Sequence, residues 1–145
     1  SYRLSIDLYV TIAYNEKGDT QAAFDLARKN VNRMIDMHAE EMPETLIVSC
    51  LFAESACKHG EMQDVDLALK LLKLHENKNH TIGLDSNNSY VFYESLALVY
   101  LKKGNYNAAI SSAQIMAKAL SNMGVSTNAA DKIISLAKKA QDKNS

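Results

Sequence analysis

The sequence predicts an all-α chain built from helix pairs that repeat along its length. Three glycines, Gly18, Gly60 and Gly104, each separate two apolar stretches, and they recur at intervals of 42 and 44 residues. Within these stretches the apolar residues follow the helical period rather than strict alternation. One proline and five glycines in 145 residues leave few breaks. A period of this size is typical of supersecondary units that stack and cover one another's apolar faces.

Composition and charge narrow the class of protein. A chain of 145 residues that is 47% hydrophobic fits a single globular domain, residues 1–145, with its own core. Its net charge of −1 argues against direct nucleic-acid binding, which draws on an excess of Lys and Arg. No apolar run reaches the roughly 20 residues that a membrane helix requires. Because the chain starts at Ser1 without Met, we expect it to be a segment of a longer protein.

The two cysteines bear on the cellular compartment. Cys50 and Cys57 lie seven positions apart on one predicted helix, which places them roughly 10.5 Å apart along its axis. A disulfide needs Cα atoms within about 7 Å, so they do not pair with each other. Free thiols favour a reducing, cytoplasmic location. Although Cys57 is followed by Lys58 and His59, we expect a structural thiol there rather than a reactive one.

The first repeat unit, about residues 2–42, contains two predicted helices. They run over about residues 2–17 and from residue 20 to residue 37 or 39. Gly18 ends the first helix, and the Asp19 side chain is expected to cap the second.

The second unit covers about residues 43–88. Pro43 begins its first helix, which runs to Lys58, because the first turn of a helix needs no proline N–H. Asp64 is expected to cap the next helix, which is apolar nearly all round and therefore should have neighbours on several sides. The stretch 76–88 is rich in Asn, His and Lys and is the expected loop.

The third unit, about residues 89–124, holds helices over residues 89–103 and from residue 106 to residue 120 or 122. A last helix at about residues 126–141 has no partner helix after it. We expect it to serve as the terminal cap that stacked repeats require.

Like residues fall at the same offset from each glycine. The sets are Tyr14, Ala56 and Tyr100 four before it; Ala23, Val65 and Ala109 five after it; and Ala27, Leu69 and Ala113 nine after it. The third unit, YESLALVYLKKGNYNAAI, is the clearest, and its pattern resembles the tetratricopeptide repeat. The resemblance covers roughly residues 5–120, with a period longer than the family's 34 residues. It implies a short right-handed solenoid of antiparallel helix pairs with a C-terminal capping helix.

The second unit departs from the family pattern. It has Ala56 where Tyr is usual and Val65 where Ala is usual. Two alignments of this unit with the family pattern, one helical turn apart, are therefore possible. In the alternative register, Ala68 is the small residue at the helix contact.

The resemblance also implies where a partner binds, because in this family the first helices of successive pairs line a concave surface. The inward positions are ten, six and three residues before each glycine: Leu8, Ile12 and Asn15, then Cys50, Glu54 and Cys57, then Glu94, Leu98 and Leu101. This set contains no carboxylate clamp and is mixed apolar and acidic. We therefore expect a non-enzymatic scaffold or regulatory domain that binds a protein or peptide. Its predicted partner-binding residues are Leu8, Ile12, Asn15, Glu54, Glu94, Leu98 and Leu101.

Two other functions stay open. One is a sensory domain that binds a short peptide or small ligand and signals to an output domain outside this chain; the aromatic group at residues 90–93 motivates it. The other is a homodimerisation module that uses the same apolar stripe.

Nothing in the sequence predicts a catalytic residue, a cofactor or a metal site. There is no phosphate-binding glycine loop, nucleophile elbow or paired carboxylate motif. The four histidines do not form the one-turn pair of a helical zinc site. His75 and His80 flank the expected loop at 76–88, and we interpret them as solvated rather than as metal ligands.

Overall fold

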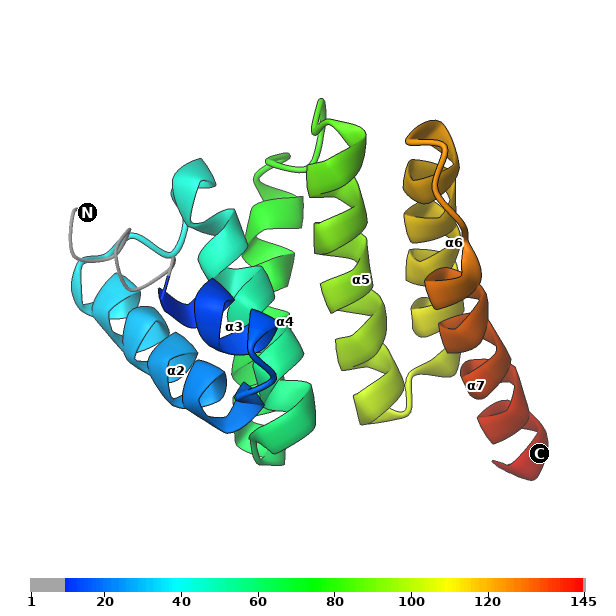
Figure 1. Ribbon diagram of the computed structural model, residues 1–145, viewed down its shortest axis with the longest axis horizontal. Coiled ribbons are helices and arrows are strands. Elements are labelled where there is room, and N and C mark those ends of the chain that lie inside the picture. Colours follow the sequence, from blue (N-terminus) through cyan, green and yellow to red (C-terminus); the bar gives the residue numbers. More distant parts are fainter. Residues whose placement is uncertain (1–9, 145) are drawn as a thin grey trace.

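The computed structural model describes residues 10–144, and all regular secondary structure in that range is helical, with no strand. Residues 10–16 are helical and are followed by α2 (Thr20–Asp36). The later elements are the 3-10 turn η1 (Pro43–Thr45), α3 (Leu46–His59), α4 (Met62–Asn77), α5 (Ser86–Lys103), α6 (Tyr106–Asn122) and α7 (Asn128–Asn144). The helices succeed one another along the longest axis of the molecule (Figure 1). The all-α prediction is confirmed.

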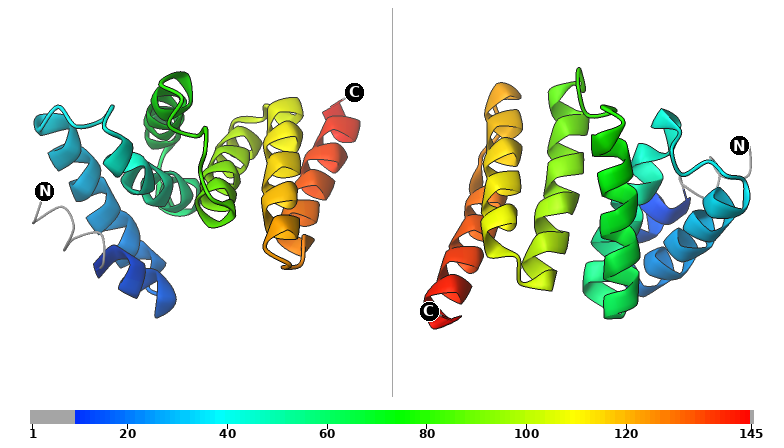
Figure 2. Two further views of the ribbon diagram at one scale, coloured as in Figure 1. Left: turned by 90° about the horizontal axis from the view of Figure 1, so that it is seen from above. Right: turned by 180° about the vertical axis from the view of Figure 1, so that it is seen from behind.

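Two helices, α3 and α5, have the most neighbours. α3 packs against α2, α4 and α5, while α5 packs against α3, α4, α6 and α7. Seen from above, α4 lies to one side of the α3 and α5 pair (Figure 2). One face of α3 and α5 is therefore covered by α4.

Two apolar cores meet at α5. The first joins α2, α3, α4 and α5 around Phe24, Met34, Phe52, Leu72 and Phe92. The second joins α5, α6 and α7 around Ala97, Met116, Leu120 and Ile133. Tyr93 packs against both cores. The alanines at matched offsets from the glycines, Ala23, Ala27, Ala56, Ala109 and Ala113, are all buried. In α4, Val65 and Ala68 are both fully buried.

The three repeat glycines serve two different purposes. Gly18 and Gly104 have φ values of +82° and +79°, the left-handed region in which a helix end favours glycine. Gly60 has an ordinary φ of −86°. A Cβ on Gly60, however, would lie 2.9 Å from both the Ala56 carbonyl oxygen and Asp64 Cβ. Glycine is needed there because the chain passes too close to its neighbours for a side chain.

Polar caps set the starts of the helices. The Asp19 side chain accepts a hydrogen bond from the Ala22 N–H, as predicted, and Asn105 caps α6 in the same way. Asp85 accepts from the Asn88 N–H, so α5 begins at Ser86, three residues earlier than expected, and the loop is shorter. Pro43 opens a 3-10 turn, and the α-helical hydrogen bonding of α3 begins only at Leu46.

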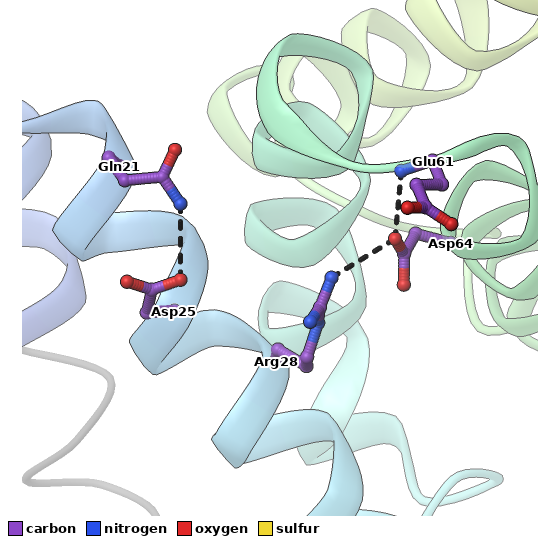
Figure 3. Close-up of polar contacts among 5 residues, drawn as sticks. All are labelled: Gln21, Asp25, Arg28, Glu61 and Asp64. Carbon is purple, nitrogen blue, oxygen red and sulfur yellow. Dashed lines mark hydrogen bonds and ion pairs between the residues drawn. The ribbon is translucent and has the colours of Figure 1, made fainter.

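The start of α4 differs from the sequence prediction. Glu61, not Asp64, is the N-cap, and Asp64 is the third helical residue, whose Oδ2 accepts the Glu61 N–H at 2.9 Å. Arg28 of α2 donates to the same oxygen at 3.1 Å (Figure 3). One carboxylate therefore fixes the first turn of α4 and links it to α2.

Candidate partner-binding groove between α3 and α5

A pocket of about 400 Å³ opens between α3 and α5. It is lined by Glu54, Cys57 and Lys58 from α3 and by Leu98, Leu101 and Lys102 from α5. We call these six residues the α3–α5 groove. The two helices are joined beside it by a hydrogen bond from Ser95 Oγ to the Cys50 carbonyl oxygen, at 3.3 Å.

Helical periodicity explains why these residues share one surface. Positions three and four apart lie on the same side of a helix, and this places Glu54 beside Lys58, and Leu98 beside Lys102. The core residues of the same helices, such as Phe52 and Leu96, follow a different stripe and are almost completely buried. The two groove leucines are partly buried: one side of each packs against the core of α5, α6 and α7, and each also lines the pocket.

One end of the groove is acidic. Burial raises the pKa of the Glu94 carboxyl, and the nearby Glu54 carboxylate raises it further. Tyr90 Oη donates a long hydrogen bond of 3.5 Å to Glu94 Oε2 and, with the positive charge of Lys58, partly offsets these effects. The Glu54 carboxylate disfavours the charged form of Glu94, and a cation placed between the two carboxylates would offset this repulsion.

The other end is basic. Lys58 and Lys102 are exposed, and neither forms an ion pair with any residue in the range 10–144. Together with the neighbouring Glu94, the groove therefore presents two carboxylates, a central leucine pair and two ammonium groups without an ion-pair partner in that range.

The thiols in and behind the groove are poor nucleophiles. Burial raises the pKa of Cys50 to about 12. Burial also raises the pKa of Cys57 to about 11, although the positive charge of Lys102 acts in the opposite direction. A thiol needs to ionise to attack, so these values favour the structural interpretation of Cys57.

The structure brings together part of the predicted partner-binding set. Glu54, Leu98 and Leu101 line one pocket, and Glu94 lies close enough to Glu54 for their charges to interact. Ile12 and Asn15 are partly buried on the helix at 10–16 and do not line the groove. Leu8 lies outside the described residues.

Sequence reasoning missed the two groove lysines. Lys58 and Lys102 each stand two residues before a repeat glycine and four residues after a predicted partner-binding position. Extending the helical stripe by one more turn identifies both. Cys50 was placed at an inward position, but it is buried beneath the groove.

The expectation of a solvated loop was wrong for His75. α4 continues to Asn77, so His75 lies inside the helix and is fully buried. Its Nδ1 is 2.9 Å from Nδ1 of His80, and its Nε2 is 3.5 Å from Ser49 Oγ. Burial, followed by the neighbouring His80, lowers the pKa of His75 to about 4. Among the described residues, no three His, Cys, Asp or Glu side chains are grouped to hold a metal ion.

Comparisons with known proteins identify no relative. No family model, curated protein or solved structure matches the chain. Across residues 10–144, every helix is too short or too polar to cross a membrane.

Proposed function

We propose that this chain is a non-enzymatic protein-interaction domain, a short tetratricopeptide-like solenoid whose α3–α5 groove binds a segment of a partner protein. The observation that carries the proposal is the convergence of Glu54, Leu98 and Leu101. These residues were predicted as partner-binding from two different repeat units, and they line one pocket.

The order of helix contacts supports the solenoid. α3 packs on α5 and α5 packs on α7, so the first helices of the second and third units and the C-terminal helix lie side by side in order. α2, α4 and α6 each pack beside the first helix of their own unit or of the following one. α7 buries Ala130, Ile133 and Ala137 against its neighbours and exposes several lysines, as a terminal cap should.

The leucines supply the affinity in this proposal. Covering an apolar side chain of this size contributes about 1.5 to 3 kcal/mol when burial is complete. Because Leu98 and Leu101 are already partly buried, each offers a fraction of that amount. The charged residues around them contribute mainly to orientation and to selection of partners.

The test compares what the domain retains from a lysate of the cells that produce it. The native domain is immobilised beside a Leu98→Glu/Leu101→Glu variant and a Leu136→Glu control. Leu136 is 46% exposed on α7, so its substitution adds a charge to an exposed apolar position outside the groove. We expect a retained protein that the groove variant loses and the control keeps. Equal retention by all three folded proteins overturns the proposal.

A second candidate, binding of a small ligand, is supported by the size of the pocket. Its volume of about 400 Å³ falls within the range of roughly 300 to 1,000 Å³ that is usual for small-molecule sites. A ligand that binds the folded state raises the melting temperature by mass action. A metabolite library that leaves the melting temperature of the native domain unchanged counts against this candidate.

Self-association through the same leucines is the third candidate. Sedimentation at high protein concentration tests it directly, because Leu98→Glu should convert a groove-mediated dimer to a monomer. A native protein that is already monomeric excludes it.

A further inference from the structure

Charges in the α3–α5 groove are arranged in the same order on both helices. On α3, Glu54 precedes Lys58 by four residues. On α5, Glu94, Leu98 and Lys102 follow one another at the same spacing. Four residues correspond to about 6 Å along a helix, so each step is about one turn.

Contacts between the two helices show that the matching charges lie at the same ends. Cys50 contacts Ser95 near the start of the groove, and Glu54 interacts with Glu94. Further along the two helices, the positive charge of Lys102 lowers the pKa of the Cys57 thiol. From the hydrogen bond between Ser95 and Cys50 to the interaction of Cys57 with Lys102, residue numbers rise on both helices, so α3 and α5 run in the same direction beside the groove. Glu54 and Glu94 therefore precede Lys58 and Lys102 along this direction, and Lys58 is still close enough to Glu94 to act on its pKa.

On the basis of the proposed function, we infer that the preferred partner is an amphipathic helix with opposite charges on the two sides of one apolar anchor. The anchor occupies the pocket between Cys57, Leu98 and Leu101. A lysine or arginine one turn away faces Glu54 and Glu94, and an aspartate or glutamate one turn away on the other side faces Lys58 and Lys102.

Charge complementarity is the first argument for this occupant. None of Glu54, Lys58 and Lys102 forms an ion pair within residues 10–144, so a partner has no internal bridge to break. A segment with one sign of charge satisfies one end of the groove and is repelled at the other.

The chemistry of the lining favours a helix over an extended peptide. An extended peptide needs groups that hydrogen-bond its exposed backbone N–H and C=O groups. The groove residues include no Asn, Gln, Ser or Thr side chain, so only Glu54, Lys58 and Lys102 could hydrogen-bond such a backbone. A helix satisfies its own backbone and presents only side chains, which suits a lining of apolar and charged residues.

The probes are synthetic Ala-rich helical peptides that carry three side chains one turn apart. The dipolar peptides have Lys, Leu and Glu in either order. The single-sign peptides have Lys, Leu and Lys or Glu, Leu and Glu, and a further dipolar peptide has Ala in place of Leu. In low salt, we expect at least one dipolar Leu peptide to bind the native domain at least tenfold more tightly than the others. The preference should shrink as salt is added.

A charge-reversed groove tests whether these residues make the choice. The variant Lys58→Glu/Lys102→Glu makes both ends acidic and should transfer the preference to the Lys, Leu, Lys peptide. Lys132→Glu/Lys138→Glu on α7 carries the same change in net charge outside the groove and should leave the preference unchanged. Circular dichroism verifies that both variants are folded.

The outcomes separate this inference from the proposed function. The inference is overturned if dipolar and single-sign peptides bind equally, if no peptide binds, or if the α7 control shifts the preference as much as the groove variant. Retention of a lysate protein that is lost with Leu98→Glu/Leu101→Glu supports the proposed function even then. Loss of both results removes the groove as a binding site.

Discussion

Nδ1 of His75 and Nδ1 of His80 lie 2.9 Å apart, so one imidazole donates its Nδ1 proton to the other. The two rings are also in contact, with their centroids 5.1 Å apart. Two neutral rings can form this bond, whereas two protonated rings each carry a proton on Nδ1 and repel each other. The pair therefore requires at least one neutral histidine. Burial favours His75 as the neutral ring.

Stability should fall in mild acid because of His75. Its pKa is about 4 in the folded protein and about 6.5 in an unfolded chain, so between these values the unfolded state binds more protons. The contribution is fully present above pH 6.5 and is lost as the pH falls to 4, by about 3 kcal/mol in all. Urea unfolding at several pH values measures it.

His75→Gln is the matched variant for this measurement. It removes the titrating ring and retains a polar side chain, so the difference between native and variant curves isolates His75 from the acidic residues. We expect the native curve to fall more steeply than the variant curve from pH 6.5 to pH 4. Parallel curves would show that His75 does not titrate in this range.

Gly60 and Gly104 should respond differently to substitution. Gly60→Ala forces a methyl group against the Ala56 carbonyl oxygen and should cost about 1 to 3 kcal/mol of unfolding free energy. Gly104→Asn places the residue best tolerated after glycine in a left-handed conformation, with no neighbour closer than 3.8 Å, and should cost less than about 1 kcal/mol. Chemical denaturation measures the free energy of unfolding of both variants. A larger loss for Gly104→Asn than for Gly60→Ala contradicts the steric explanation.

Substitution of Asp64 should lower the free energy of unfolding more than substitution of Arg28, although the two residues share an ion pair. Asp64→Ala removes the capping-box carboxylate that accepts the Glu61 N–H, and loss of such a hydrogen bond costs about 1 kcal/mol. Arg28→Ala should cost less than that, because its side chain is 47% exposed and surface ion pairs contribute about 0 to 1 kcal/mol. A double-mutant cycle measures their coupling. A cost for Arg28→Ala above that of Asp64→Ala disagrees with this assignment.

Both cysteines should be slow to alkylate in the folded protein. With pKa values of about 11 and about 12, Cys57 and Cys50 contain little thiolate at pH 8, and we expect iodoacetamide to react at least tenfold more slowly than in the unfolded chain. Cys57 should react before Cys50, which is deeper. Mass spectrometry of timed samples reports both sites, and rapid labelling of Cys50 in native conditions contradicts its burial.

Helix ends could be predicted from the sequence where the signal for them is local. Asp19, Gly18 and Gly104 act within one turn of the chain, and their predicted roles hold. Gly60 looked equivalent to them, but its role depends on Ala56 and Asp64, which only folding brings near. His75 looked solvated because its neighbours in sequence are polar, whereas its burial is produced by packing of the whole of α4.

The groove was predictable only in part for the same reason. Repeat spacing placed Glu54 and Leu98 on a common surface without any knowledge of distances. It did not show that Cys50 lies below that surface, since this depends on how closely α3 approaches α5. The contribution of Lys58 and Lys102 follows from their helical spacing once the neighbouring helix is known.

The position of α5 between the two cores has a consequence for how the molecule comes apart. α7 rests mainly on α5 and α6, so it can detach without disturbing the contacts among α2, α3 and α4. α5 itself contributes Phe92 to one core and Ala97 to the other. Pulling on the C-terminus should therefore release α7 at low force, and rupture of α5 should be the event that dismantles both halves together.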